Sequence, residues 1–133
     1  MMDADRRIDA FLNASSFAVA GASSRRHKYG NIIFRALQDS GRIVYPLNPI
    51  ENDVEGAKAY RHLADLPEVP IALSIVTPPS VTRDIVNEAI QLGVRHLWMQ
   101  PGAEDPIACE CARDAGLSLI ADQSCLLVAL AIA

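Results

Sequence analysis

The stretch FAVAGASSRRHKYG, residues 17–30, decides the fold. Its first four residues form a continuous apolar run, which is typical of a strand buried on both faces of a parallel sheet. Gly21 permits a tight turn directly after this strand. A helix is predicted for 30–40, where apolar residues recur at helical spacing, and Gly41 is expected to end it. The stretch therefore indicates a strand–loop–helix unit.

The same alternation continues along the chain. Pro46 is expected to end a second strand, while Ser80 and Asp105 are expected to cap later helices. The polar segment 51–58 is expected to be a loop. Strands are predicted at 43–45, 71–76, 94–99 and 117–121, a short edge strand at 59–60, helices at 3–13, 80–92 and 105–115, and a single helical turn at 62–66.

Regular alternation of strands and helices requires right-handed crossovers and a parallel sheet with helices on both faces. We therefore expect the α/β class: a Rossmann-like, doubly wound parallel sheet of about five to six strands, in three α/β/α layers. A chain of 133 residues fits one domain, which we place over residues 1–133.

Composition narrows the classes of function. The formal charge of −4 argues against general nucleic-acid binding, which needs a basic face. The longest apolar run, 126–133, is too short to span a bilayer. Cys109, Cys111 and Cys125 match neither a zinc half-site nor a C-x-x-C pair, so we expect no metal. An odd cysteine count without a signal peptide indicates reduced thiols and a cytoplasmic protein.

In an open doubly wound sheet, ligands bind beyond the carboxyl ends of the strands, where the strand order reverses. Here the crevice is expected between the first strand and the strand at 71–76, with 43–45 on the other side. The first loop supplies Gly21 and hydroxyl donors near a helix start, and its three cations suit a phosphate-rich ligand. A solvated basic loop is the alternative. The candidate residues of this loop are Gly21, Ala22, Ser23, Ser24, Arg25, Arg26, Lys28 and Tyr29.

Three further loops are expected around the same crevice. Asn48 and Pro49 follow the second strand, where Asn48 either binds the ligand or caps a turn. Thr77, Pro78 and Pro79 follow the strand at 71–76, as a rigid ledge for an adenine ring or as a plain helix start. The loop after 94–99 adds its own candidates, which are Gln100, Pro101 and Gly102.

The first loop is not the dinucleotide fingerprint. G-x-G-x-x-G needs glycine where Ser23 stands, and the next glycine, Gly30, comes too late. The second strand also lacks the acid that binds the ribose in such domains, because Glu51 lies two residues beyond Pro49. Binding of NAD or FAD therefore loses support.

Taken in order, the loop sequences resemble the small CoA-binding protein family. They are also similar to the CoA-binding domains of the succinyl-CoA synthetase alpha subunit and of ADP-forming acyl-CoA synthetases. The matching segments are 19–24 (VAGASS), 45–49 (YPLNP), 76–79 (VTPP), 97–103 (LWMQPGA) and 122–126 (DQSCL).

The resemblance implies a Rossmann-like fold that holds coenzyme A, or an acyl-CoA, along the strand ends. The pyrophosphate is then expected near Gly21, Ser23 and Ser24, with charge from Arg25, Arg26 or Lys28, and the adenine near 76–79. The phosphohistidine of the synthetases lies in a second domain, so the resemblance implies binding without that reaction.

Catalysis finds little support in the sequence. His27, His62 and His96 are scattered, and none has a cysteine or carboxylate at triad spacing, so no catalytic residue is assigned. Cys125 is either a buried small residue or a thiol that exchanges with that of CoA. Three functions stay open: a CoA module, an NAD(P)-type sensing domain, and a subunit of an enzyme acting on CoA thioesters. The apolar tail packs on the domain, on a second copy in a homodimer, or on an unknown protein partner.

Overall fold

The computed structural model describes residues 4–132 and shows a sheet of five parallel strands in the order β2-β1-β5-β6-β7. The order reverses between β1 and β5, as predicted. Residues 1–3 and 133, which the predicted domain and its terminal elements include, lie outside the described part. The strands are β1 (Phe17–Ala20), β2 (Val44–Leu47), β5 (Ala72–Ile75), β6 (His96–Met99) and β7 (Ser118–Ile120).

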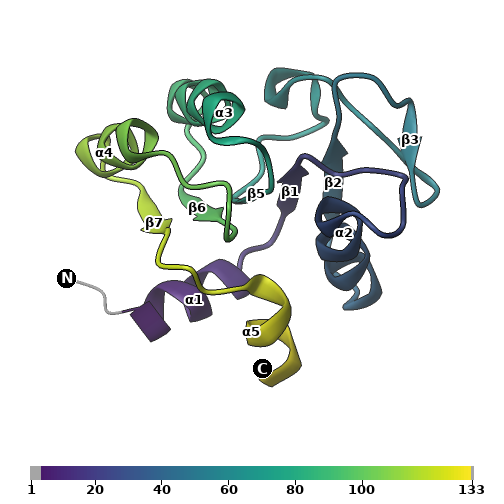
Figure 1. Ribbon diagram of the computed structural model, residues 1–133, viewed down its shortest axis with the longest axis horizontal. Coiled ribbons are helices and arrows are strands. Elements are labelled where there is room, and N and C mark those ends of the chain that lie inside the picture. The colour runs from purple at the N-terminus through teal and green to yellow at the C-terminus, as the bar shows by residue number, and fades with distance from the viewer. Residues whose placement is uncertain (1–3, 133) are drawn as a thin grey trace.

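Helices cover both faces of this sheet (Figure 1). α3 and α4 pack on one face, and α1, α2 and α5 pack on the other. The predicted three-layer, Rossmann-like α/β fold is therefore confirmed. The helices are α1 (Ala4–Leu12), α2 (Tyr29–Asp39), α3 (Pro79–Leu92), α4 (Pro106–Asp114) and α5 (Leu126–Ile132), and η1 (Leu63–Asp65) is the short turn expected at 62–66.

Each face has its own apolar core. Leu73 and Leu97 lie on the face beneath α3 and α4, whereas Val19 and Trp98 lie on the face beneath α1 and α2. β1 and β5 are buried at every position, which explains why β1 is wholly apolar and why Ser74 is the single polar residue of β5. The ring of Trp98 stands edge-on to Phe11, with 5.2 Å between the centroids.

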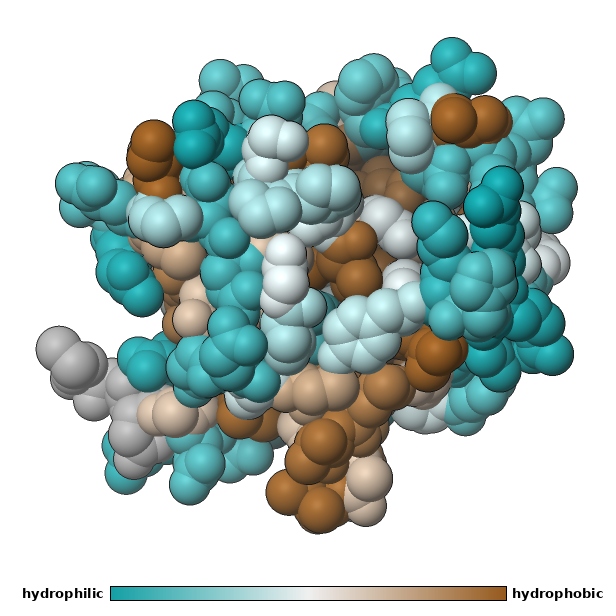
Figure 2. All heavy atoms as spheres, viewed as in Figure 1, coloured by the Kyte–Doolittle hydropathy of each residue, from teal (hydrophilic) through white to brown (hydrophobic). Residues whose placement is uncertain are grey.

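The apolar tail folds back as α5 and packs beside α2, where Leu126 is fully buried. Val128 and Ile132 stay 61% and 82% exposed, and Figure 2 shows an apolar patch over this helix. One side of the apolar tail therefore packs on the domain, and the other side is exposed. No helix within 4–132 combines the length and apolarity needed to cross a membrane.

Two predicted element boundaries were wrong. β2 continues through Pro46 to Leu47, because β2 is an edge strand. The carbonyl of Pro46 accepts from Tyr60 N at 3.0 Å on the side away from β1, so the missing N–H faces that side too. Ser80 does not cap α3. The helix begins at Pro79, a position that suits the fixed φ of proline.

The segment predicted as a loop over 51–58 contains a small antiparallel hairpin. Its strands are β3 (Asp53–Val54) and β4 (Ala57–Lys58). Glu55 and Gly56 form the turn, with φ of 49° and 81°. Strands of two residues are too short to produce a periodic pattern, so only the Glu-Gly pair signals the turn. The edge strand expected at 59–60 is reduced to a single bridge between Tyr60 and Leu47.

Candidate functional site

A cleft of about 760 Å³ lies at the carboxyl ends of β1, β2 and β5. Figure 2 shows the molecule hollowed near the middle of this face, with apolar atoms on the floor and mostly polar atoms on the rim. The floor includes Ala20, Leu47 and Val76 from the strand ends, and α3 forms a wall with Val81 and Ile85. The cleft therefore lies where the strand order reverses, the usual ligand position in this fold.

Half of the predicted ligand-binding residues line the cleft, and the other half do not. The predicted residues that line it are Gly21, Ser23, Lys28, Tyr29, Asn48, Pro49, Thr77 and Pro78. Those outside its lining are Ala22, Ser24, Arg25, Arg26, Pro79, Gln100, Pro101 and Gly102. Ala22 and Gln100 are fully buried. Gln100 contacts a cleft residue although it does not line the cleft. Its side-chain oxygen accepts from Leu126 N at 3.0 Å and lies 3.4 Å from the Tyr29 hydroxyl.

The start of α2 packs directly on the turn after β1. A Cβ on Gly30 would lie 2.0 Å from the carbonyl oxygen of Gly21. A Cβ on Gly21 would lie 2.3 Å from the carbonyl oxygen of Val76, and Gly21 has a φ of 90°. Both positions therefore require glycine. Gly30 does not fit the spacing of the G-x-G-x-x-G fingerprint. It still allows the close approach of helix and strand that the third glycine allows in that motif.

Asn48 shapes the loop after β2. Its side-chain oxygen accepts from the backbone N–H groups of Ile50 and Glu51, both at 2.8 Å, and its amide donates to the carbonyl of Ala22 at 2.8 Å. The side chain thus caps a turn and ties the first two loops together. Of the two interpretations left open by the sequence, turn capping is the one these contacts show.

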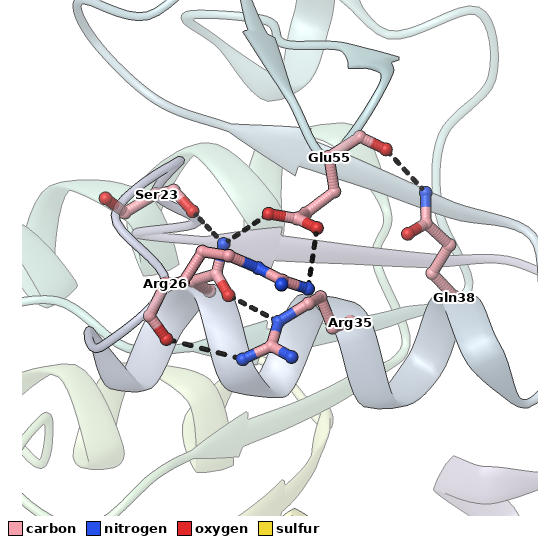
Figure 3. Close-up of polar contacts among 6 residues, drawn as sticks. Ser23, Arg26, Arg35, Gln38 and Glu55 are labelled. Atoms are coloured by element: carbon pink, nitrogen blue, oxygen red, sulfur yellow. Dashed lines mark hydrogen bonds and ion pairs between the residues drawn. The ribbon is translucent and has the colours of Figure 1, made fainter.

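A second polar cluster holds the first loop from the side of the hairpin (Figure 3). Buried Asn31 donates to the carbonyl of Ser23 at 2.8 Å and to the carboxylate of Glu55 at 3.0 Å. Arg26 pairs with the same carboxylate at 3.3 Å, and Arg35 donates to the Asn31 oxygen at 2.6 Å. The Asn31 hydrogen bond and then the two arginines lower the pKa of Glu55. Arg26 is therefore directed toward Glu55.

Glu51 makes a comparable contact at the tip of the first loop. Ser24 donates its backbone N–H to one carboxylate oxygen at 2.7 Å and its hydroxyl to the other at 2.5 Å. The donors of Ser24, predicted for a phosphate, are therefore directed at an acidic side chain of this protein.

Tyr29 connects the cleft with a second groove. Its hydroxyl lies 2.6 Å from the sulfur of Cys125, which lines a groove between α1 and α5. Burial, followed by this contact, raises the pKa of Tyr29. Cys125 does not line the cleft, so its predicted exchange with a CoA thiol remains a prediction.

Several cleft residues were not predicted from the sequence. Arg61 and His62 enter from the segment between β4 and η1, and α3 adds Asp84 and Glu88. Glu88 also accepts from the backbone N–H of Leu63 at 3.1 Å, which fixes η1 against α3. These are ordinary charged residues of an exposed turn and helix face. Only the way η1 folds across α3 shows that they belong to the site.

The cleft combines groups that favour an anion with an apolar surface, and Asp84 and Glu88 add two carboxylates to its lining. The first N–H groups of a helix lack intrahelical partners and favour negative charge, and Lys28, Tyr29 and Gly30 place the start of α2 in the cleft. Lys28 adds a cation and makes no side-chain cap on these groups. Within 4–132, no three His, Cys, Asp or Glu side chains gather as a metal site.

Comparison with known proteins agrees with this geometry. A family model described as CoA binding domain matches residues 15–131. The chain is 37% identical over 90 residues to the alpha subunit of the ADP-forming acetate–CoA ligase II of Pyrococcus furiosus. That match covers 66% of this chain and 20% of the subunit, so the chain spans about a fifth of this relative's length.

Solved structures with the same fold include proteins of similar size and much larger ones. A hypothetical protein from Pyrococcus horikoshii OT3 has a TM-score of 0.90 and 29% identity, over 96% of this chain and 89% of that chain. The dinucleotide forming acetyl-coenzyme A synthetase 1 of Ca. Korarchaeum cryptofilum, in complex with phosphate and ADP, has a TM-score of 0.76 and 24% identity. It matches 87% of this chain over 27% of its own, a likeness of fold alone.

Proposed function

This chain belongs to the family of CoA binding domains, and from that premise we propose that it binds coenzyme A, or an acyl-CoA, in the cleft beside β1, β2 and β5. The observation that carries the proposal is the cleft itself. Its volume of about 760 Å³ falls within the range of small-molecule sites. It also opens at the point where doubly wound sheets bind nucleotides.

The phosphates are proposed to lie at the start of α2. Lys28 and the backbone of Tyr29 and Gly30 line the cleft there, and the junction of Gly21 with Gly30 lets a ligand approach the main chain closely. Ser23 adds a hydroxyl group. Arg61, which no motif indicates, is a further cation in the lining of the cleft.

The adenine ring is proposed to rest on the apolar side of the cleft. Val76 and Pro78 form the edge of this side, and Val81 and Ile85 continue it along α3. The bond between Thr77 and Thr82 hydroxyls, at 2.8 Å, ties the ledge to the first turn of α3. A rigid ledge is favourable, because little side-chain entropy is lost when a ring packs on it.

Binding without catalysis is the function that these residues support best. His62 lines the cleft, and within the described residues no hydrogen bond joins it to a carboxylate or a cysteine, as a nucleophile–base–acid triad would need. We therefore propose a binding module, cytoplasmic and acting alone or with a separate protein. An NAD(P)-type sensing domain and a subunit of an enzyme acting on CoA thioesters are the alternatives.

A thermal-shift series with CoA, dephospho-CoA, acetyl-CoA, NAD and NADP tests the proposal. A ligand at a hundred times its dissociation constant adds about 2.7 kcal/mol to the free energy of unfolding. We expect the midpoint to rise with the CoA compounds and to stay unchanged with NAD and NADP. A rise with the dinucleotides alone would favour the sensing domain, and no rise with any compound would refute nucleotide binding.

The variant Lys28→Gln tests whether CoA binds in this cleft. Removing a cation that contacts phosphate is expected to weaken CoA about fivefold to tenfold. Arg113→Gln, on the far helix α4, removes a positive charge away from the cleft and serves as the matched control. Product analysis after incubation with acetyl-CoA separates the binding module from an enzyme.

A further inference from the structure

Glu51 stands between the first two loops of the cleft. Although it lies two residues beyond Pro49, Asn48 turns the chain back by accepting from the backbone N–H of Glu51. The carboxylate thereby reaches the first loop, where Ser24 donates to both of its oxygens at 2.7 and 2.5 Å. β2 itself carries no acid at its end, and the turn at Asn48 brings the carboxylate of Glu51 to the first loop instead.

The position of this carboxylate is defined by its neighbours. Ser23 precedes its partner Ser24, and Asn48 and Pro49 precede Glu51 itself; all three of these neighbours line the cleft. The amide of Asn48 lies 3.4 Å from one carboxylate oxygen. The groups that hold Glu51 are thus uncharged donors. Glu51 itself is not among the lining residues, and these donors hold its charge beside the cleft without cancelling it.

An acid after the second strand has a specific effect in nucleotide-binding sheets. It accepts hydrogen bonds from free ribose hydroxyls, whereas a ribose phosphate needs a cation at that place. The side chain next to Glu51 is Ile50, which is 81% exposed and carries no charge. The end of β2 therefore offers a ligand an acceptor and a negative charge.

We propose that Glu51 is a specificity-determining residue of this cleft, favouring a nucleotide with free ribose hydroxyls over one with a ribose phosphate. The inference rests on the proposed function. CoA and dephospho-CoA differ only in the 3′-phosphate of the ribose, so this pair isolates the interaction. The class of ligand that Glu51 selects is a pantetheine conjugate of adenosine diphosphate without a phosphate monoester, of which dephospho-CoA is the example.

Calorimetric titration of CoA and dephospho-CoA into the wild-type chain and Glu51→Gln tests this inference. The wild type is expected to bind dephospho-CoA at least as tightly as CoA. Glu51→Gln is expected to shift the ratio of the two dissociation constants toward CoA by at least about fivefold, the effect of one like-charge repulsion at contact distance in water. The amide keeps an oxygen that can accept from Ser24, so the loop keeps a tether.

Asp53→Asn is the matched control. It removes one negative charge from β3, where Asp53 is exposed and pairs in register with Lys58. We expect it to leave the ratio unchanged. Glu51→Ala, with the thermal midpoint of the free protein measured beside it, is a second variant in case the amide disturbs the turn, and it should shift the ratio in the same direction.

The outcomes separate the two proposals. A ratio that Glu51→Gln and Glu51→Ala leave unchanged, while both ligands bind, overturns the specificity role alone and reduces Glu51 to a tether of the loop. A wild-type preference for CoA also overturns it. If neither ligand binds to the wild type or to any variant, the proposed function itself fails, and the role of Glu51 fails with it.

Discussion

Gly30→Ala is a sensitive test of how the cleft is built. The added Cβ would lie 2.0 Å from the carbonyl oxygen of Gly21, whereas such contacts essentially never fall below 3.0 Å. The start of α2 must therefore move by about 1 Å or more, which corresponds to an overpacking cost of roughly 1–3 kcal/mol. Helix propensity acts in the opposite direction, because alanine is better than glycine in a helix by about 1 kcal/mol.

The expected net result is a loss of up to about 2 kcal/mol in the free energy of unfolding. For a domain of this size that lowers the thermal midpoint by about 4 °C per kcal/mol. CoA affinity should fall about tenfold, since the amides at the start of α2 move with the helix. Thermal melting and calorimetric titration of the same preparations provide both values.

Gly41→Ala is the control for this variant. Gly41 ends α2 with a φ of 82°, and an added Cβ there meets nothing within 4 Å. The control should therefore lose stability through its positive φ, by roughly 1 kcal/mol, and keep its affinity. The reasoning would be refuted if Gly30→Ala were as stable as the wild type and bound CoA equally well, because the packing at Gly21 would then have no consequence.

Three other predictions concern stability. Asn31→Ala should lower the free energy of unfolding in urea by about 1–3 kcal/mol, because two half-buried acceptors, the Ser23 carbonyl and the Glu55 carboxylate, lose their buried donor; Asn87→Ala, which changes an exposed asparagine of α3, should alter it little. Arg83 and the N–H of Ala108 at the start of α4 lower the pKa of Asp105. The carboxylate therefore contributes to the free energy of unfolding at neutral pH, and this contribution is lost as the pH falls below about 3.9. Asp105→Asn should therefore be less stable than the wild type at pH 7, and urea titrations toward acid pH should show the difference shrinking. Burial lowers the pKa of His96, whose Nδ1 has no partner among the described residues, so stability should fall as the pH drops below about 6.5. His96→Asn should make the loss of stability between pH 7.5 and 5 smaller in urea titrations. A loss as large as that of the wild type would show that other groups cause it.

The fold could be predicted from the sequence because it depends on local patterns. The mostly apolar stretches at 17–20 and 72–75 are buried on both faces of the sheet, and glycines such as Gly41 and Gly93 end the helices they follow. Alternation of strand and helix leaves few ways to connect a parallel sheet. The reversal between β1 and β5 follows from that restriction, and with it the position of the cleft.

The details of the site depend on contacts between distant segments, which no local pattern contains. Ser24 and Arg26 looked like phosphate ligands, yet Glu51 and Glu55 meet them because the hairpin folds over the first loop. Arg61 enters the cleft because η1 packs against α3.

The sequence by itself determined the class of fold, the edge of the sheet that holds the cleft, and the resemblance to CoA-binding domains. Only the tertiary structure decided which charges face the cleft and which are paired within the protein. The physical reason is range. Strand and helix patterns are set by neighbours within a few residues, whereas the partners of Ser24 and Arg26 lie more than twenty residues away, at a distance set by turns such as the one at Asn48.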